Sequence, residues 1–96
     1  MVLRLTIKKK WFDLISSGLK KEEYREIKPY WISRLMLTDG TFKKFDKIEF
    51  INGYKKDSPR VTTECNGIIK GLGNPDLGAF KDKEVFIIKL GNVLQP

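Results

Sequence analysis

Residues 18–28 read GLKKEEYREIK, and the change from helix to strand within this stretch decides the fold. Gly18 stands where a left-handed residue would end a short helix, and the residues after it alternate as in a strand over 19–28. One face of that strand carries Leu19, Lys21, Glu23, Arg25 and Ile27, and the other carries Lys20, Glu22, Tyr24, Glu26 and Lys28. Two alternatives remain for Glu23 and Arg25, which can form an ion pair: they line a cleft, or they face solvent while Tyr24 packs inside.

The segments on both sides of this stretch predict two short helices. Residues 2–8 alternate as a half-buried strand, and residues 9–17 then place Trp11 at a core-facing helical position. Pro29 suits the first position of a second helix, which carries Trp31 on its apolar stripe. We therefore expect both tryptophans in the core.

The second half of the sequence predicts further strands. Residues 47–52 and 60–70 are strand-like, and Asn66-Gly67 predicts a bulge or sharp bend in the second of them. Residues 71–83 form a loop that lacks a phosphate-binding motif. Residues 84–90 are apolar on both faces, which is typical of a central strand.

Length and element order together predict the fold class. A chain of 96 residues has the length of one domain, so residues 1–96 are taken as a single unit. Strands outnumber helices, and both helices lie in the first half. The predicted architecture is α+β: a small, partly open barrel of about five or six strands with two short helices packed against it.

The composition excludes several classes of site. The chain has no histidine and one cysteine, so it can form neither a Ser-His-Asp or Cys-His nucleophile system nor an internal disulfide. No acidic run has the spacing of a metal site, and we expect no metal and no cofactor. Cys65 is expected to pack as a small apolar residue. Apolar stretches are short and no targeting segment is visible, which predicts a cytoplasmic monomer that does not enter membranes.

The charge distribution favours a polyanionic ligand. Nineteen Lys and Arg against twelve Asp and Glu give a net charge of +7. Residues 1–48 hold twelve basic and six acidic side chains, whereas residues 49–96 hold seven and six. Basic residues also cluster with aromatic ones, as in single-stranded nucleic-acid grooves, with Tyr24, Tyr30 and Tyr54 as the better stacking candidates. The alternative is charge that serves solubility alone.

For catalysis, the residues offer one pair. Lys20 beside Glu23 could act as a general base if burial lowers its pKa. Glu22 and Glu23 are adjacent and point to opposite faces, so they do not form a dyad that shares a proton.

The motif Gly18-x-Lys20-x-x-Glu23-x-Arg25 resembles the signature of the ASCH family, which is related to PUA domains. Residues 24–31 and 52–60 are also similar to short, stand-alone bacterial and phage members. The resemblance implies a PUA-like mixed β-barrel with a cleft between helices and barrel, lined by Lys20, Glu23 and Arg25, that binds RNA or a nucleotide-like ligand.

One branch of that family is similar to amidohydrolases of acylated cytidine nucleosides. That branch uses the motif lysine, which Lys20 matches, and a threonine where this chain has Glu23. It also uses a glutamate near the last strand, where residues 71–83 supply only Asp76 and Asp82. These departures weaken the amidohydrolase hypothesis.

Three functions follow as hypotheses. The first is a nucleic-acid-binding domain, most directly an RNA-binding one, with Lys55 and Lys56 as additional phosphate contacts and a ligand site of Lys20, Glu23, Tyr24, Arg25, Lys28, Asn52, Tyr54 and Arg60. The second is a hydrolase of a modified nucleoside or of RNA, with Lys20 as base and Glu23 as its partner. The third is a protein-interaction module, which a large exposed apolar patch would mark.

Overall fold

The computed structural model describes residues 1–95, which form a five-stranded sheet and two short helices. The strands are β1 (Val2–Thr6), β2 (Glu22–Arg25), β3 (Lys47–Ile51), β4 (Arg60–Leu72) and β5 (Glu84–Gln95). The helices are α1 (Lys9–Ser16) and α2 (Pro29–Leu35), and a short 3₁₀ helix, η1, covers Pro75–Leu77. The strand order is β1-β3-β4-β5-β2, with β1 parallel to β3 and the other neighbours antiparallel. The predicted α+β class, mixed sheet and two helices are confirmed.

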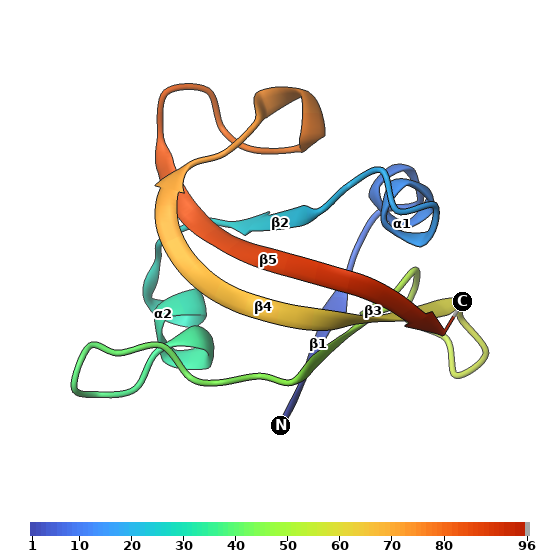
Figure 1. Cartoon of the computed structure of the whole chain (residues 1–96), viewed down its shortest axis with the longest axis horizontal. Helices are drawn as coiled ribbons and strands as arrows, with labels where there is room; N and C mark the ends of the chain where they lie inside the picture. The colour runs from blue at the N-terminus through green and yellow to red at the C-terminus, as the bar shows by residue number, and fades with distance from the viewer. Residues whose placement is uncertain (96) are drawn as a thin grey trace.

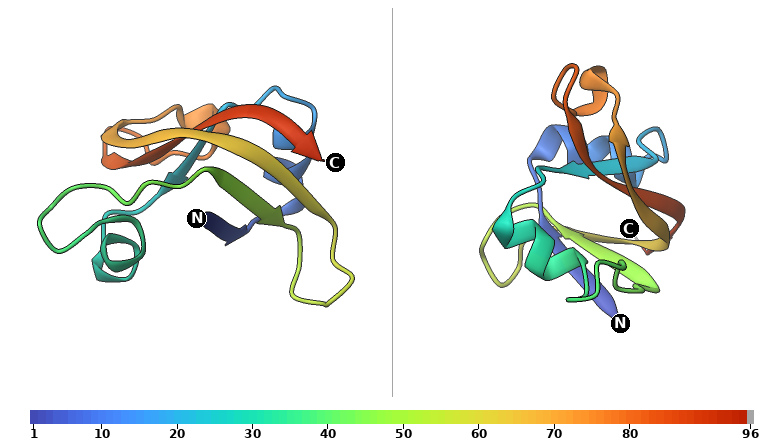
Figure 2. Two further views of the ribbon diagram at one scale, coloured as in Figure 1. Left: turned by 60° about the horizontal axis from the view of Figure 1, so that its bottom comes forward. Right: turned by 90° about the vertical axis from the view of Figure 1, so that its left-hand side faces the viewer.

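The sheet curls into a half-barrel that stays open between its edge strands, β1 and β2 (Figure 1 and Figure 2). The long strands β4 and β5 form its curved back, while α1 and α2 lie at opposite ends of β2 (Figure 1). The pairing of β4 with β5 shifts register between Cys65 and Ile68, which bends the strand. The predicted irregularity at Asn66-Gly67 falls within this shift, and Gly67 has a φ of 112°.

Gly18 ends the first helical segment as the sequence predicted. It adopts a φ of 80°, and the amides of Leu19 and Lys20 both donate to the carbonyl of Leu14, at 2.9 and 3.0 Å. This closure holds the residues directly after Gly18 at the end of α1. For that reason β2 begins at Glu22 and not at residue 19; at its other end it stops at Arg25, ahead of α2, so it is shorter than the predicted strand over residues 19–28.

The hairpin of β4 and β5 is longer than predicted. β4 continues to Leu72 and β5 to Gln95, beyond the predicted ends at residues 70 and 90. Leu72 pairs with Glu84 across the hairpin, so the start of the predicted loop belongs to the sheet. The ends of these strands are set by cross-strand pairing with residues distant in the sequence, and a local sequence pattern cannot show that pairing.

The main core lies between the sheet and the two helices. Its fully buried side chains include Leu3, Leu5, Ile15, Leu35, Ile48, Phe50, Phe86 and Ile88. Each such burial stabilises the fold by about 1.5–3 kcal/mol. Cys65 is partly buried against this core, in agreement with the expectation of a packed residue.

A second, smaller cluster covers the other face of β2 and β5. It consists of Tyr24, Val85 and Ile87, with Leu77 and Ala79 from the loop around η1 packed on them. Both faces of β5 are therefore covered, and its predicted central position is confirmed. β2 is also buried on both faces, since Glu23 is 5% and Tyr24 9% exposed. Of the two alternatives for this strand, the one that left Glu23 facing solvent is wrong, although its expectation that Tyr24 packs inside is met.

Within residues 1–95, no helix is both long enough and apolar enough to cross a membrane.

Candidate functional site

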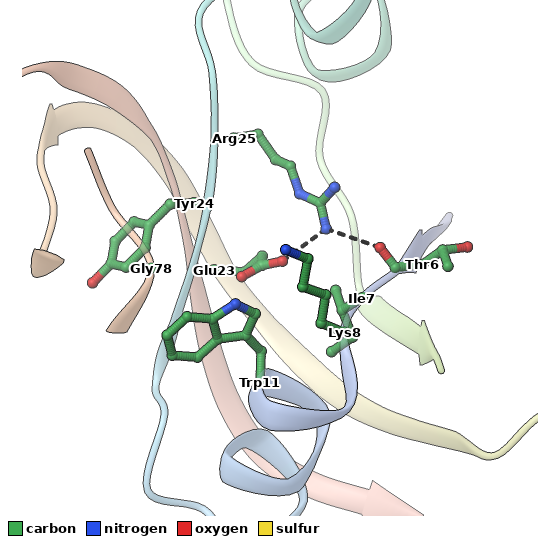
Figure 3. A pocket seen from close by; sticks show the side chains of 8 residues that line it. All are labelled: Thr6, Ile7, Lys8, Trp11, Glu23, Tyr24, Arg25 and Gly78. Carbon is green, nitrogen blue, oxygen red and sulfur yellow. Dashed lines mark hydrogen bonds and ion pairs between the residues drawn. The ribbon is translucent and has the colours of Figure 1, made fainter. Parts of the chain in front are cut away.

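The candidate site is a pocket in the opening between β1 and β2 (Figure 3). It has a volume of about 230 Å³ and is lined by Thr6, Ile7, Lys8, Trp11, Glu23, Tyr24, Arg25 and Gly78. The end of β1, the first turn of α1, the strand β2 and the loop after η1 all contribute to its wall. We call this space the site pocket.

Arg25 connects the two edge strands across the site pocket. Its Nη2 donates to Oε2 of Glu23 at 2.7 Å, and to the carbonyl of Thr6 at 3.4 Å (Figure 3). Its guanidinium also lies 4.8 Å from the ring centroid of Trp31, on α2. The Nε atom of Arg25 is buried and has no hydrogen-bond partner among the described residues. A guanidinium carries five donors, so Arg25 keeps hydrogen-bonding capacity toward a ligand.

Glu23 bridges two cations inside the wall of the site pocket. Its Oε2 accepts from Arg25, and its Oε1 lies 3.5 Å from Nζ of Lys20. The side chains of Glu23 and Lys20 are 7% and 1% exposed. A buried carboxylate between two cations fixes the orientation of Arg25, because moving either cation would leave a buried charge unpaired.

Lys20 lies behind Glu23 rather than in the lining of the site pocket. Its Nζ is 4.7 Å from the ring centroids of both Trp11 and Tyr24, and it donates to the carbonyl of Leu77. Burial lowers the pKa of Lys20 below its usual 10.5, and the attraction of Glu23 opposes that shift. The motif lysine therefore acts on the site pocket through Glu23, not by direct contact.

Tyr24 packs inside the fold, so its ring is not exposed to a ligand. Its hydroxyl donates to Oε1 of Glu22 at 2.8 Å and accepts from the amide of Asn74 at 3.2 Å. Burial is the main cause that raises its pKa above 10.0. At Gly73, an added Cβ would lie 2.5 Å from Cε1 of Tyr24, so the loop before η1 fits closely against the ring. Of the three tyrosines expected to stack on bases, this one has almost no free face.

Two further hollows adjoin the site pocket. The Asn52 hollow, of about 390 Å³, is lined by Thr6, Ile7, Lys8, Asn52, Gly53 and Tyr54. The Trp31 hollow, of about 270 Å³, is lined by Arg4, Leu5, Thr6, Arg25, Tyr30, Trp31, Arg34 and Tyr54. All three spaces share Thr6, and together they form what we call the groove. Its lining includes four basic side chains and one carboxylate, Glu23, which is already paired with two cations.

The structure brings most of the predicted site residues together. Glu23, Tyr24 and Arg25 line the site pocket, whereas Lys20, which the resemblance also placed in the lining, lies behind Glu23. Asn52 and Tyr54 line the adjacent Asn52 hollow, where Nδ2 of Asn52 donates to the carbonyl of Ile7 at 3.0 Å.

Lys28 and Arg60 are not among the residues that line the groove. Lys28 lies 3.5 Å from Glu26, and Arg60 lies 3.1 Å from Glu49. Each of these predicted phosphate contacts therefore already has a carboxylate partner. Lys55 and Lys56 are exposed in the turn that follows β3.

Ten lining residues of the groove were not among the predicted site residues: Arg4, Leu5, Thr6, Ile7, Lys8, Trp11, Trp31, Arg34, Gly53 and Gly78. Trp11 was assigned to the core by its helical spacing, and it does pack against the core with one part while lining the site pocket with another. Gly78 has a φ of 106°, and an added Cβ would lie 3.3 Å from the Trp11 ring. The polar face of the strand over residues 2–8 was the one available signal for Arg4, Thr6 and Lys8.

Two other features of the described residues bear on the remaining hypotheses. Within residues 1–95, no group of three or more His, Cys, Asp or Glu side chains is placed to hold a metal ion. Away from the groove, a hollow of about 520 Å³ is lined by Met1, Leu37, Thr41, Phe42, Lys43 and Lys44. Its lining is largely apolar, so it is the surface that a protein-interaction module would use.

No protein-family model matches this sequence, and neither curated proteins nor solved structures return a match to it.

Proposed function

We propose that this chain is a nucleic-acid-binding domain of the ASCH type, with a PUA-like fold, that holds single-stranded RNA or a nucleotide-like ligand in the groove. The position of Arg25 carries the proposal. Its guanidinium is held across the opening between β1 and β2 by Glu23 and Thr6, and the side chain lines the site pocket with 18% of its surface exposed. A phosphate oxygen or an acceptor on a base edge would accept from the N–H groups of this exposed part.

The charge of the groove supports the same proposal. Arg4, Lys8, Arg25 and Arg34 line it, while Glu23 is occupied by Lys20 and Arg25. Arg4 shares the carboxylate of Glu49 with Arg60, each at 3.1 Å, so Arg4 contributes less free charge than Lys8 and Arg34. Concentrated positive charge attracts a phosphate backbone, because binding releases the counterions condensed on it. In this proposal Arg25 binds phosphate, Glu23 orients Arg25, and Lys20 holds Glu23 from behind.

The test is a titration of a short, labelled single-stranded RNA, followed by fluorescence anisotropy at about 50 and 200 mM salt. We expect a dissociation constant in the micromolar range that rises steeply with salt. Arg25→Lys keeps the charge but loses the planar fork, so it should weaken binding, and Arg25→Gln should weaken it further. Each variant is first compared with the wild type by thermal unfolding, because Arg25 also pairs with Glu23.

Lys47→Gln is the matched control for charge. Lys47 is exposed and pairs with Val2, at the opposite end of β1 from Thr6. It should change the affinity little. Binding that is independent of salt, or equal in the wild type and Arg25→Gln, would overturn the proposal.

The buried pair of Lys20 and Glu23 favours a second candidate, hydrolysis of a modified nucleoside or of RNA. A lysine whose pKa is lowered by burial beside a carboxylate is a recurrent arrangement at catalytic sites. Because Lys20 is enclosed by Glu23, Trp11 and Tyr24, Glu23 is the member of the pair that would touch the substrate.

This candidate is tested by incubating the protein with an acylated cytidine and measuring release of the acid by chromatography. Hydrolysis should be lost in Glu23→Gln and in Lys20→Met, which keeps the length of the buried side chain. Turnover that persists in Glu23→Gln would exclude this assignment.

A further inference from the structure

We propose that the Trp31 hollow binds a second nucleotide, so that the groove takes a single strand of at least two nucleotides rather than a free nucleoside or mononucleotide. This inference rests on the proposed nucleic-acid-binding function and names its ligand more closely. The first nucleotide occupies the site pocket, and the next one in the strand occupies the Trp31 hollow.

The lining of the Trp31 hollow has the chemistry of a nucleotide site. Three of the eight residues around the Trp31 hollow are arginines, three are aromatic and none is acidic: Arg4, Arg25 and Arg34, with Tyr30, Trp31 and Tyr54. Arginines suit phosphate oxygens, and aromatic rings suit the faces of bases without regard to sequence. Such a combination is typical of surfaces that bind single strands.

Four of these six side chains, those of Arg25, Arg34, Tyr30 and Trp31, are held in place before a ligand arrives. The Trp31 ring lies 4.8 Å from the guanidinium of Arg25 and 5.3 Å from that of Arg34. Nη2 of Arg34 donates to the carbonyl of Arg4 at 3.2 Å, and Tyr30 meets Trp31 edge-on with ring centroids 4.9 Å apart. Fixed side chains lose little conformational entropy when a ligand binds.

Two tyrosine rings of the Trp31 hollow are exposed. Tyr54 is 94% exposed and Tyr30 is 59% exposed, although both line the hollow. These rings can therefore take a base on a free face, which the buried Tyr24 cannot do.

The Trp31 hollow is continuous with the site pocket. Thr6 and Arg25 line both the site pocket and the Trp31 hollow, so Arg25 lies where the phosphate between two neighbouring nucleosides would pass. The site pocket alone, at about 230 Å³, is smaller than most ligand pockets, which span about 300–1,000 Å³. A ligand that extends past Arg25 uses both spaces.

The two tryptophans of the chain make the test direct, because Trp11 lines the site pocket and Trp31 lines the Trp31 hollow. In Trp31→Phe the remaining fluorescence reports on the site pocket, and in Trp11→Phe it reports on the Trp31 hollow. Each single-tryptophan protein is titrated with uridine 5′-monophosphate and with the dinucleotide UpU. We expect the mononucleotide to quench mainly Trp11, and UpU to quench both and to bind about tenfold tighter.

Variants of the Trp31 hollow separate this inference from the proposed function. Tyr54→Ala and Arg34→Gln should each weaken UpU binding about tenfold and leave binding of the mononucleotide within about twofold. Tyr54 is almost fully exposed, so its replacement does not disturb the fold, and Lys47→Gln again serves as the control for charge.

The outcomes are distinguishable. Equal affinity for the mononucleotide and UpU, with no effect of Tyr54→Ala or Arg34→Gln, would overturn the second subsite and leave the proposed function standing. Failure of both nucleotides and of longer RNA to bind would overturn the proposed function, and this inference with it.

Discussion

The ammonium group of Lys20 and the carboxylate of Glu23 lie 3.5 Å apart, and both side chains are more than nine-tenths buried. Arg25 approaches the same carboxylate to 2.7 Å from the side of the site pocket. The three residues form a row of alternating charge: an inner cation, a buried anion and an outer cation at the surface of the groove. Each neutralises its neighbour, so the removal of one member leaves another unpaired.

Glu23→Gln should lower the free energy of unfolding by about 3–5 kcal/mol, because Lys20 would remain buried without its anion. Urea unfolding measures this loss. Glu26→Gln is the matched control, since Glu26 pairs with Lys28 and Lys83 on the surface, and it should change stability little. The double variant Lys20→Met/Glu23→Gln should lose less than the two single losses combined, and strict additivity would contradict the coupling.

Lys20 should give the stability a pH dependence of its own. Burial lowers the pKa of Lys20 below 10.5, so between that lowered pKa and 10.5 the unfolded chain binds more protons than the folded one. The free energy of unfolding should therefore rise with pH across this window. Urea unfolding at a series of alkaline pH values should show the rise in the wild type but not in Lys20→Met, and parallel curves for the two proteins would argue against it.

Tyr24 should contribute the opposite slope at higher pH. Burial raises its pKa above 10.0, so the unfolded chain ionises this phenol first and stability falls as pH passes from 10.0 to the raised pKa. The same series of measurements on Tyr24→Phe should lack this fall. If Tyr24→Phe and the wild type lose stability equally above pH 10.0, the fall has another source.

The fit of the loop before η1 against Tyr24 is tested by a single methyl group. In Gly73→Ala the new Cβ would lie 2.5 Å from the Tyr24 ring and 2.7 Å from Cβ of Ala79, and overpacking of this kind costs about 1–3 kcal/mol. Gly71→Ala is the control, because its Cβ meets only Ile87 Cδ1 at 3.4 Å. Thermal unfolding of the two variants compares them, and equal stability would show that the loop can move away from Tyr24.

The single buried residue of α2 should decide whether this helix stays in place. Leu35 is fully buried, and Leu35→Ala should cost about 2–5 kcal/mol. Ile32 on the same helix is 40% exposed, so Ile32→Ala should cost much less. Because α2 carries Tyr30, Trp31 and Arg34, Leu35→Ala should also weaken RNA binding at temperatures below its melting point. Unchanged stability would mean that α2 is held by other contacts.

Local sequence patterns predicted the elements that local forces determine. The cap at Gly18, the break at Asn66-Gly67 and the apolar run over residues 84–90 each depend on neighbouring residues, and each was found. The predicted start of β2 was wrong because the closure of the helix end, in which the amides of Leu19 and Lys20 donate to Leu14, competes with strand pairing there. The ends of β4 and β5 were wrong because cross-strand partners set them.

In the candidate site, too, some residues could be predicted from local sequence and others depend on the fold. Lys20, Glu23 and Arg25 were predicted together because the motif places them on one short segment. The contact of Lys20 with the Leu77 carbonyl joins residues 57 apart in sequence, and no pattern within β2 reveals that this loop encloses the lysine. The Trp31 hollow likewise needs α2 to dock beside β1, which follows from the fold and not from spacing.

Two arginines of the groove also cover an edge of the sheet. Along the outer edge of β1 the carbonyls of Arg4 and Thr6 face away from β3, and each accepts from an arginine, Arg34 and Arg25 respectively. An uncovered edge of this kind is a template on which a strand from another molecule can pair. Loss of both arginines should therefore leave this edge of β1 open to pairing with a strand of another copy.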